Sequence, residues 1–373
     1  MTRAGIVGMG LWVPEVVRGN DAWGDAFVRA HRKHIASRLE RDFTQIEATD
    51  DERPYNELFV RHAGPHEADP FKGAKFRRIA DPNVPTIEGD ARACRAALAD
   101  ANIEPRDIDL ILSSALIQDA LVPSNGPAIQ DIVGCVRAPG IGVEGYCSSS
   151  VAQLDLAAGI VEAGRARFVL CVQSHQINRV NDMSLPSSPI FGDGSGAFVV
   201  GQVPEGSGLT HLVRGGDGAL RRAVTLEFHT TPGATWWRDG SGPVVPGTDD
   251  PVAARRLVRS VLTYPIETIR ELCSAAELSC NAIDVLSMIQ PVAWYQAAVA
   301  DGLGIDLRRV PSTHSEYAHL GGAAIVANLL EARRLGMLRG GSNVVLYAHG
   351  AGLTRYAALL KWPNDNGHSA EAR

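Results

Sequence analysis

The chain has 373 residues, of which 45% are hydrophobic and 21% charged, and its 36 Lys and Arg against 42 Asp and Glu give a net charge of −6. This composition is typical of a globular protein with two domains, or with one large domain built from two similar halves. Because the charges are scattered, no concentrated basic face is expected and nucleic acid is excluded as the main partner. No apolar run approaches the roughly 18 residues of a membrane span. The start MTRAGIVGMGLWVPE predicts a short strand rather than a signal peptide, which favours a cytoplasmic location.

Short apolar runs alternate with helical patterns along the chain, which predicts an α/β fold. The strand runs are apolar on both faces, as expected for sheets that helices cover on both sides. The expected strands are Gly5–Gly8, Asp109–Ser114, Phe168–Gln173, Ala197–Gly201, Val285–Ile289 and Asn343–Ala348. The expected helices are Ile87–Ala101, Ser149–Ala163, Pro251–Ser274, Trp294–Leu303 and Gly322–Leu335.

Two segments differ from this pattern. Residues 16–75 are rich in charge and end in a turn-rich stretch, so we expect a partly helical insertion that serves as a lid or a dimer contact. The polar tail after Trp362 is expected to be disordered.

An internal repeat is the most informative feature of the organisation. Three matches occur in the same order at nearly one offset, and they pair Asp109 with Asp284, Leu170 with Leu346, and Gly164 with Gly336. They predict a duplicated strand–helix unit whose two halves, residues 1–205 and 206–373, pack about a pseudo-twofold axis. Equivalent loops of the two halves would then face each other near the middle of the molecule.

One cysteine stands where a helix begins. In VEGYCSSSVAQLDLAAG, Cys147 follows an apolar stretch and precedes a Ser-rich helix start. The free N–H groups and partial positive charge of a helix N-terminus favour a thiolate, which is the nucleophilic form. A small buried residue that packs a sharp turn is the alternative. The six cysteines are few for this length and none forms a CxxC pair, so we expect thiols at 94, 135, 147, 171, 273 and 280.

The repeat assigns this cysteine a partner. The 172-residue offset of the two helices takes Cys147 to His319, in EYAHLGGAAIVANLL, also just before a helix. Facing each other across the axis, they would form the minimal apparatus for covalent acyl transfer. The later glycine motif HGAGLT (His349–Thr354) follows a strand and is expected to present a backbone N–H to an acyl oxygen.

Other polar residues near this position carry weaker expectations. Glu144 and Glu316 each stand three residues before a member of the Cys–His pair, where they would orient His319, bind a polar acceptor, or simply face solvent. No cluster has the spacing of a zinc site, because His314 and His319 lack a third nearby ligand. We expect neither a metal nor a cofactor beyond the acyl thioester itself.

Four stretches together resemble the β-ketoacyl-ACP synthase III branch of the thiolase superfamily: RRIADPNVPTIEGDARACRAALADANIEPRDIDLILSS, EGYCSSSVAQLDLAAGIVEAG, FGDGSGAFVVG, and HLGGAAIVANLLEARRLGML with HGAGLTRYAALL. The resemblance implies the five-layered αβαβα thiolase fold, a homodimer, an acyl-CoA or acyl-carrier-protein donor and an acyl-cysteine at Cys147. It also implies an oxyanion hole from the backbone N–H groups of Cys147 and Ala351.

The chain departs from this family at two positions. Synthase III enzymes carry His-Gln-Ala-Asn after a strand of the second half, where this chain has Ile289-Gln290-Pro291-Val292. A shift of one residue would place Gln290 at the histidine position, so no histidine stands there in either alignment. The asparagine of the family's Gly-Asn-Thr-Ser motif is His319 here, which resembles the histidine that activates the cysteine in thiolases.

In view of these two departures, we consider three functions, the most favoured first. The first is an acyltransferase of specialised metabolism that passes an acyl group from Cys147 to a small-molecule acceptor, with His319 as base. The second is a carbon–carbon-forming synthase in which Gln290 or water replaces the missing donor. The third is a non-catalytic partner of a second thiolase-like subunit.

Overall fold

The computed structural model describes residues 3–32, 53–66, 68–228, 244–248 and 250–363. The predicted tail after Trp362 therefore lies almost wholly outside the described residues. All six cysteines are free thiols.

The first of two main sheets belongs to the N-terminal part of the chain. Its order is β1-β7-β6-β4-β5, with β4 parallel to β5 and β6, and β7 antiparallel to β6 and β1. Its central strands are buried along almost their whole length, which explains why their apolar residues occur on both faces. The strands are β1 (Arg3–Trp12), β4 (Leu110–Ala115), β5 (Gly140–Gly142), β6 (Val169–His175) and β7 (Gly194–Val203).

The second sheet repeats the first with one strand fewer. Its order, β8-β13-β12-β11, corresponds to β1-β7-β6-β4, and each pair of neighbours keeps the same parallel or antiparallel sense. The strands are β8 (Gly208–Gly216), β11 (Val285–Met288), β12 (Asn343–Gly350) and β13 (Thr354–Lys361). The predicted duplication is confirmed at the level of sheet topology.

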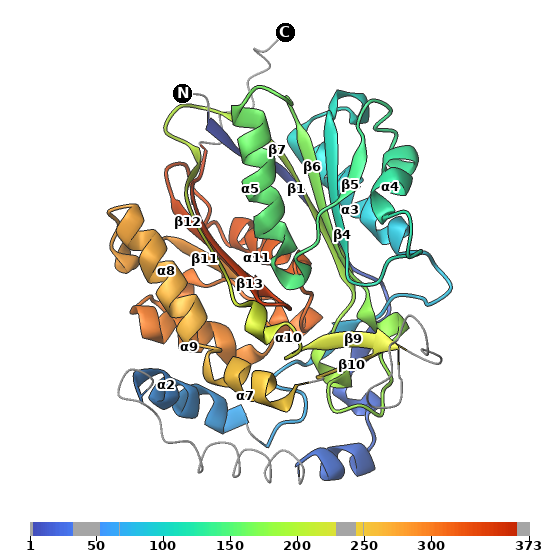
Figure 1. The fold of residues 1–373 in the computed structure, drawn as a ribbon, viewed down its shortest axis with the longest axis vertical. Coiled ribbons are helices and arrows are strands. Elements are labelled where there is room, and N and C mark those ends of the chain that lie inside the picture. Colours follow the sequence, from blue (N-terminus) through green and yellow to red (C-terminus); the bar gives the residue numbers. More distant parts are fainter. Residues whose placement is uncertain (1–2, 33–52, 67, 229–243, 249, 364–373) are drawn as a thin grey trace.

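Helices complete five layers (Figure 1). Helices α3 (Thr86–Ala101) and α4 (Asn125–Val133) cover the outer face of the first sheet, and α8 (Thr263–Ala275) covers that of the second, with α9 (Ala293–Leu303) packed against α8. Helices α5 (Ser149–Glu162) and α11 (Ala323–Arg334) contact both sheets and form the middle layer. The expected α/β fold of αβαβα type is confirmed. Because α5 and α11 are equivalent in the repeat, their N-termini bring Cys147 and His319 to the centre.

One predicted helix is divided into two helices in the structure. The pattern 251–274 folds as α7 (Pro251–Arg259) and α8, with a break at residues 260–262. Pro265 in the first turn of α8 explains the break, because a proline ring clashes with the carbonyl four residues earlier in a continuous helix.

The insertion predicted at 16–75 is partly helical where it is described. β2 (Val17–Gly19) pairs with β3 (Phe76–Arg78), and α2 (Arg53–Ala63) packs on α9. Residues 33–52 lie outside the described part, so the lid or dimer role stays a prediction. A further hairpin joins β9 (Thr225–Phe228) to β10 (Val244–Gly247).

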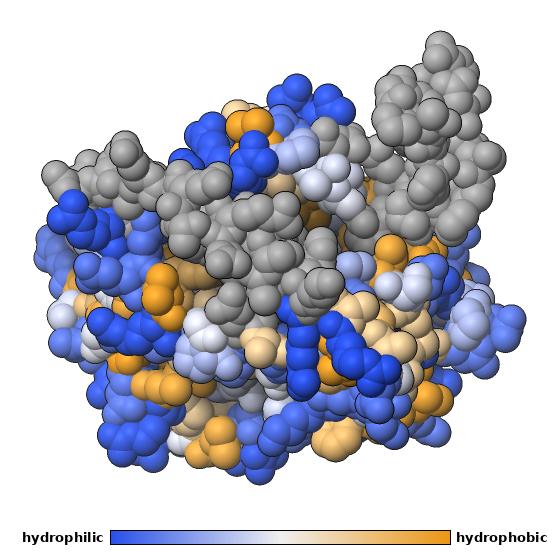
Figure 2. Space-filling view, turned by 90° about the horizontal axis from the view of Figure 1, so that it is seen from below, coloured by the Kyte–Doolittle hydropathy of each residue, from blue (hydrophilic) through white to orange (hydrophobic). Residues whose placement is uncertain are grey.

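The surface seen from below is mostly hydrophilic, with hydrophobic residues in separate groups (Figure 2). Across the described residues, every helix is too short or too polar to cross a membrane.

Candidate active site

Cys147 lies in a tight turn rather than in a helix. The 3₁₀ turn Tyr146–Ser148 directly precedes α5, and Tyr146 has a positive φ of 54°. Oε1 of Glu144 accepts hydrogen bonds from the backbone N–H of Gly145 (3.2 Å) and of Tyr146 (2.8 Å). Glu144, a residue proposed above to support His319, therefore holds the turn that carries the cysteine.

His319 is fixed by backbone bonds on both sides. Its N–H donates to the carbonyl of Ile190 (3.0 Å), and its carbonyl accepts from the N–H of Gly192 (3.1 Å). Ala318 before it has a φ of 54° and ψ of −146°, which turns the chain from α10 (His314–Tyr317) toward α11. These bonds fix the backbone of His319, and the residue is 5% exposed.

The two residues meet: Cys147 Sγ lies 3.4 Å from His319 Nε2, within hydrogen-bond distance for sulfur. Burial, and then the charge of Glu144, raise the pKa of the Cys147 thiol to about 12, against a smaller opposing effect of its backbone N–H. Burial also lowers the pKa of His319 well below its usual value. Both shifts favour the neutral thiol and the neutral imidazole, and so oppose the thiolate that a helix N-terminus alone favours.

Three further histidines surround His319, and their charges add to burial in lowering its pKa. His175, at the end of β6, has its ring centroid 5.4 Å from that of His319 and its Nδ1 2.9 Å from the carbonyl oxygen of Gly192. His349 lies on β12 and His314 on α10. Sequence reasoning missed the contributions of His175 and His349. The available signal was that both stand at the ends of equivalent strands.

The loop after β12 is packed against the cysteine turn. A Cβ on Gly350 would lie 2.0 Å from the carbonyl oxygen of Gly145, and Ser148 Oγ is 2.8 Å from Thr354 Oγ1. Ala351 therefore follows a residue in direct contact with the turn. The assignment of its N–H to an oxyanion hole stays a prediction.

The side chains of the other predicted supporting residues, Gln290 and Glu316, are not hydrogen-bonded to the dyad. The Gln290 side chain is buried, where Nε2 donates to Thr313 Oγ1 (2.8 Å) and Oε1 accepts from the Thr313 N–H (3.2 Å). Its backbone carbonyl instead acts on His319, raising the pKa of that imidazole against burial. Glu316 is exposed on α10. Ile289, at the family's histidine position, is 1% exposed and apolar.

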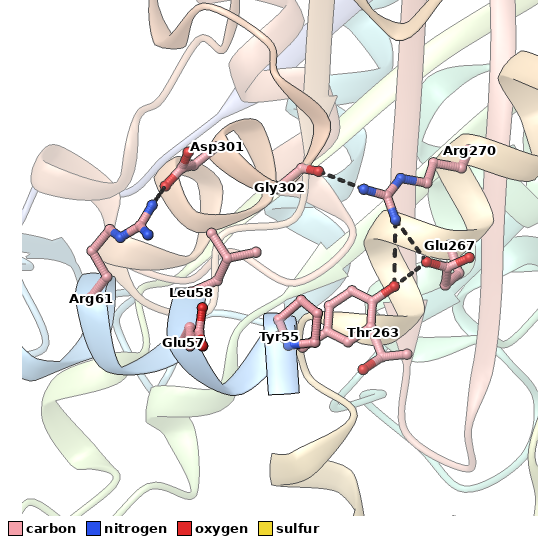
Figure 3. Close-up of a pocket in the computed structure, with 10 residues that line it drawn as sticks. Tyr55, Glu57, Leu58, Arg61, Thr263, Glu267, Arg270, Asp301 and Gly302 are labelled. Carbon is pink, nitrogen blue, oxygen red and sulfur yellow. Dashed lines mark hydrogen bonds and ion pairs between the residues drawn. The ribbon is translucent and has the colours of Figure 1, made fainter. Parts of the chain in front are cut away.

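A surface hollow of about 770 Å³ lies elsewhere, between α2 and the ends of α8 and α9 (Figure 3). Arg61 pairs with Asp301, and Arg270 donates to Glu267 and to the carbonyl of Gly302. This lining does not include the dyad. Among the described residues, no group of three or more His, Cys, Asp or Glu is arranged to hold a metal ion.

Comparison with known proteins identifies relatives of this chain. Residues 142–218 match the family model "3-Oxoacyl-[acyl-carrier-protein (ACP)] synthase III", and residues 273–362 match its C-terminal model. The beta-ketoacyl-[acyl-carrier-protein] synthase III of Rhodospirillum rubrum is 30% identical over 295 residues, covering 78% of this chain and 88% of the relative.

Solved structures agree with this match. The priming beta-ketosynthase of the R1128 polyketide pathway superposes with a TM-score of 0.76 at 25% identity, covering 97% of each chain. The synthase III of Thermus thermophilus gives a TM-score of 0.72 at 26% identity, over 96% of this chain and 99% of the other.

Proposed function

We propose a function that follows from family membership. The chain belongs to the 3-oxoacyl-[acyl-carrier-protein] synthase III family of the thiolase superfamily. Members of this family are enzymes of acyl-thioester transfer and condensation. We infer that this member is an acyltransferase of specialised metabolism. It takes an acyl group from acyl-CoA or an acyl carrier protein and passes it, through an acyl-cysteine at Cys147, to a small-molecule acceptor.

The observation that carries the proposal is the 3.4 Å contact between Cys147 Sγ and His319 Nε2. His319 is neutral, so it takes the thiol proton as the sulfur attacks the thioester carbonyl, and it returns the proton to the leaving thiol. The backbone N–H groups of Cys147 and Ala351 would stabilise the oxyanion that forms in between. No cofactor or metal is required for this step.

The residues around the dyad favour simple transfer over decarboxylative condensation. The family's second donor for a malonyl thioester is replaced by the apolar Ile289, and the amide of Gln290 is engaged by Thr313. Losing one such donor costs about 10²–10³ in rate.

The relatives' own names favour a second candidate, a carbon–carbon-forming synthase. The two candidates differ in one product, because only condensation with a malonyl thioester releases carbon dioxide.

A homodimer is part of the proposal. Strand β5 is the edge of the first sheet, and Ile141 on it is exposed. In the nearby loop, Leu121 and Val122 are 82% and 85% exposed. An unpaired edge beside exposed apolar residues is typical of a contact with a second chain.

Intact-mass measurement tests the proposal directly. Wild type and Cys147→Ala are incubated with acyl-CoA and acyl-carrier-protein donors of several chain lengths. An acyl adduct on wild type alone is expected. Absence of an adduct with every donor would favour a non-catalytic partner subunit, and carbon dioxide released from malonyl thioester would favour the condensing enzyme.

A further inference from the structure

A second histidine stands beside the nucleophile turn with a partner of its own. His349 is the penultimate residue of β12, directly before Gly350, which packs on Gly145 of the cysteine turn. Its Nδ1 lies 3.3 Å from the hydroxyl of Tyr295 on α9. A hydrogen bond there fixes the imidazole and leaves Nε2 as the nitrogen available to a ligand.

His349 packs beside two buried tyrosines. Its ring centroid lies 6.0 Å from that of Tyr295 and 5.9 Å from that of Tyr347, and both tyrosines are 0% exposed. The histidine itself is less buried than these two tyrosines.

His349 and Tyr295 are both neutral near pH 7. Burial lowers the pKa of His349 to about 4, so its imidazole is neutral at pH 7 and can accept a proton. In the tautomer that leaves Nε2 unprotonated, the Nδ1–H of His349 donates to the hydroxyl oxygen of Tyr295, and burial raises the pKa of Tyr295 so that this group stays a neutral hydroxyl.

Strand β12, which carries His349, contacts the Tyr146–Ser148 turn that contains Cys147. A positive charge on His349 disfavours protonation of His319, which places the two imidazoles in one electrostatic environment. His319 is already within hydrogen-bond distance of the sulfur. The centre therefore holds one imidazole in contact with the nucleophile and a second neutral imidazole that the acylation step does not use.

Resting on the proposed function, we infer that His349 is the general base that activates a hydroxyl acceptor, and that Tyr295 is the positioning residue that orients it. In this step Nε2 of His349 takes the hydroxyl proton while the oxygen attacks the acyl carbonyl. The new C–O bond forms, the C–S bond breaks, and the Cys147 thiolate leaves. The sulfur regains a proton from solvent and His349 releases one, so the thiol, the neutral imidazole and an ester result.

A general base at this position favours an alcohol as the acceptor. A neutral alcohol is a weak nucleophile until its proton is removed, and a positioned base accelerates that removal by about 10²–10⁴. A malonyl thioester needs no such base, because loss of carbon dioxide generates its nucleophile.

The test uses acyl-enzyme that is prepared from wild type and from each variant with an acyl-CoA donor, and is then freed of excess donor. Decay of the acyl adduct is followed by intact mass in buffer alone, with glycerol, and with hydroxylamine. Water and glycerol are hydroxyl nucleophiles that need a base, whereas hydroxylamine attacks thioesters without one. The variants are His349→Phe, His349→Gln and Tyr295→Phe, and His211→Gln on the exposed face of β8 is the matched control.

We expect both His349 variants to acylate, to lose about 10²-fold or more in the water and glycerol reactions, and to keep hydroxylamine cleavage within about threefold. Tyr295→Phe should lose about fivefold to tenfold in the hydroxyl reactions alone. Equal slowing with hydroxylamine, or unchanged glycerol transfer, overturns the role of His349. Failure of wild type to acylate with any donor overturns the proposed function itself, which keeps the two failures distinct.

Discussion

Gly350 and Gly145 are in contact at the point where the two halves meet: a Cβ on Gly350 would lie 2.0 Å from the carbonyl oxygen of Gly145. Carbon and oxygen cannot approach so closely, so Gly350→Ala must displace the turn that carries Cys147 or the loop that carries Ala351. We expect acylation of Cys147 to fall by at least about 10²-fold, as a misplacement of about 1 Å can cause. Stopped-flow or quenched intact-mass kinetics measures this rate.

The control for this variant is Gly159→Ala in α5, where an added Cβ meets nothing within 4 Å. Because alanine is a better helix former than glycine, this variant should gain up to about 1 kcal/mol in free energy of unfolding and acylate normally. Wild-type acylation by Gly350→Ala would show that the contact does not position the nucleophile.

Glu144 stabilises the turn that carries Cys147, and its charge also disfavours the Cys147 thiolate. Two variants separate these two effects. Glu144→Ala removes the acceptor of the Gly145 and Tyr146 N–H groups, so we expect a loss of about 1–2 kcal/mol in the free energy of unfolding. Glu144→Gln keeps an oxygen in place and removes the charge that raises the Cys147 pKa. Urea unfolding and the rate of iodoacetamide alkylation at pH 8 are the measurements.

Glu144→Gln should unfold like wild type and be alkylated faster at Cys147. If its alkylation were as slow as that of wild type, the charge of Glu144 would have no part in setting the reactivity of the thiol.

The exposed loop beside β5 gives a test of the homodimer. Replacing both Leu121 and Val122 by lysine puts like charges on opposing copies, so we expect the mass in light scattering to fall from twice the chain mass to once. Val252→Lys, on an exposed position of α7, is the control and should leave the dimer intact. A wild type that is already monomeric would refute the homodimer.

Much of the fold was predictable from the sequence. The repeat indicates two similar sheets, and strands that are apolar on both faces indicate that helices cover each sheet on both sides. The pairing of Cys147 with His319 was predictable for the same reason: a single offset relates the starts of α5 and α11. The break between α7 and α8 required Pro265 to be weighed against a continuous helical pattern.

The protonation states of the site were not predictable. The helix-start argument for a Cys147 thiolate uses only local sequence, whereas the dominant effect, desolvation, depends on what packs over the sulfur. His175 and His349 reach the site from strand ends far from His319 in sequence. The repeat places both at the ends of equivalent strands but gives no reason to group them with His319.

Replacing His319 tests the dyad. His319→Ala removes the base, and His319→Asn restores the side chain that the resemblance assigns to this position without supplying a base. Both should slow acylation by about 10²–10⁴, because the Cys147 thiol, with a pKa of about 12, does not ionise unaided near pH 7. His211→Asn, at an exposed histidine, should acylate like wild type. Near-normal acylation by either His319 variant would exclude this residue as the base.

The pH dependence of acylation gives an independent test of the same base. The reaction needs neutral His319, and burial together with His175, His314 and His349 holds its pKa well below 6.5. The imidazole therefore stays neutral as the pH falls through 6.5, where an ordinary histidine at pH 6 would keep only about a quarter of its neutral form. The acylation rate should be nearly constant from pH 8 to pH 6, with no rise toward pH 9 because the thiol titrates near 12. A rate that halves near pH 6.5 would show that His319 is solvated in the reacting enzyme.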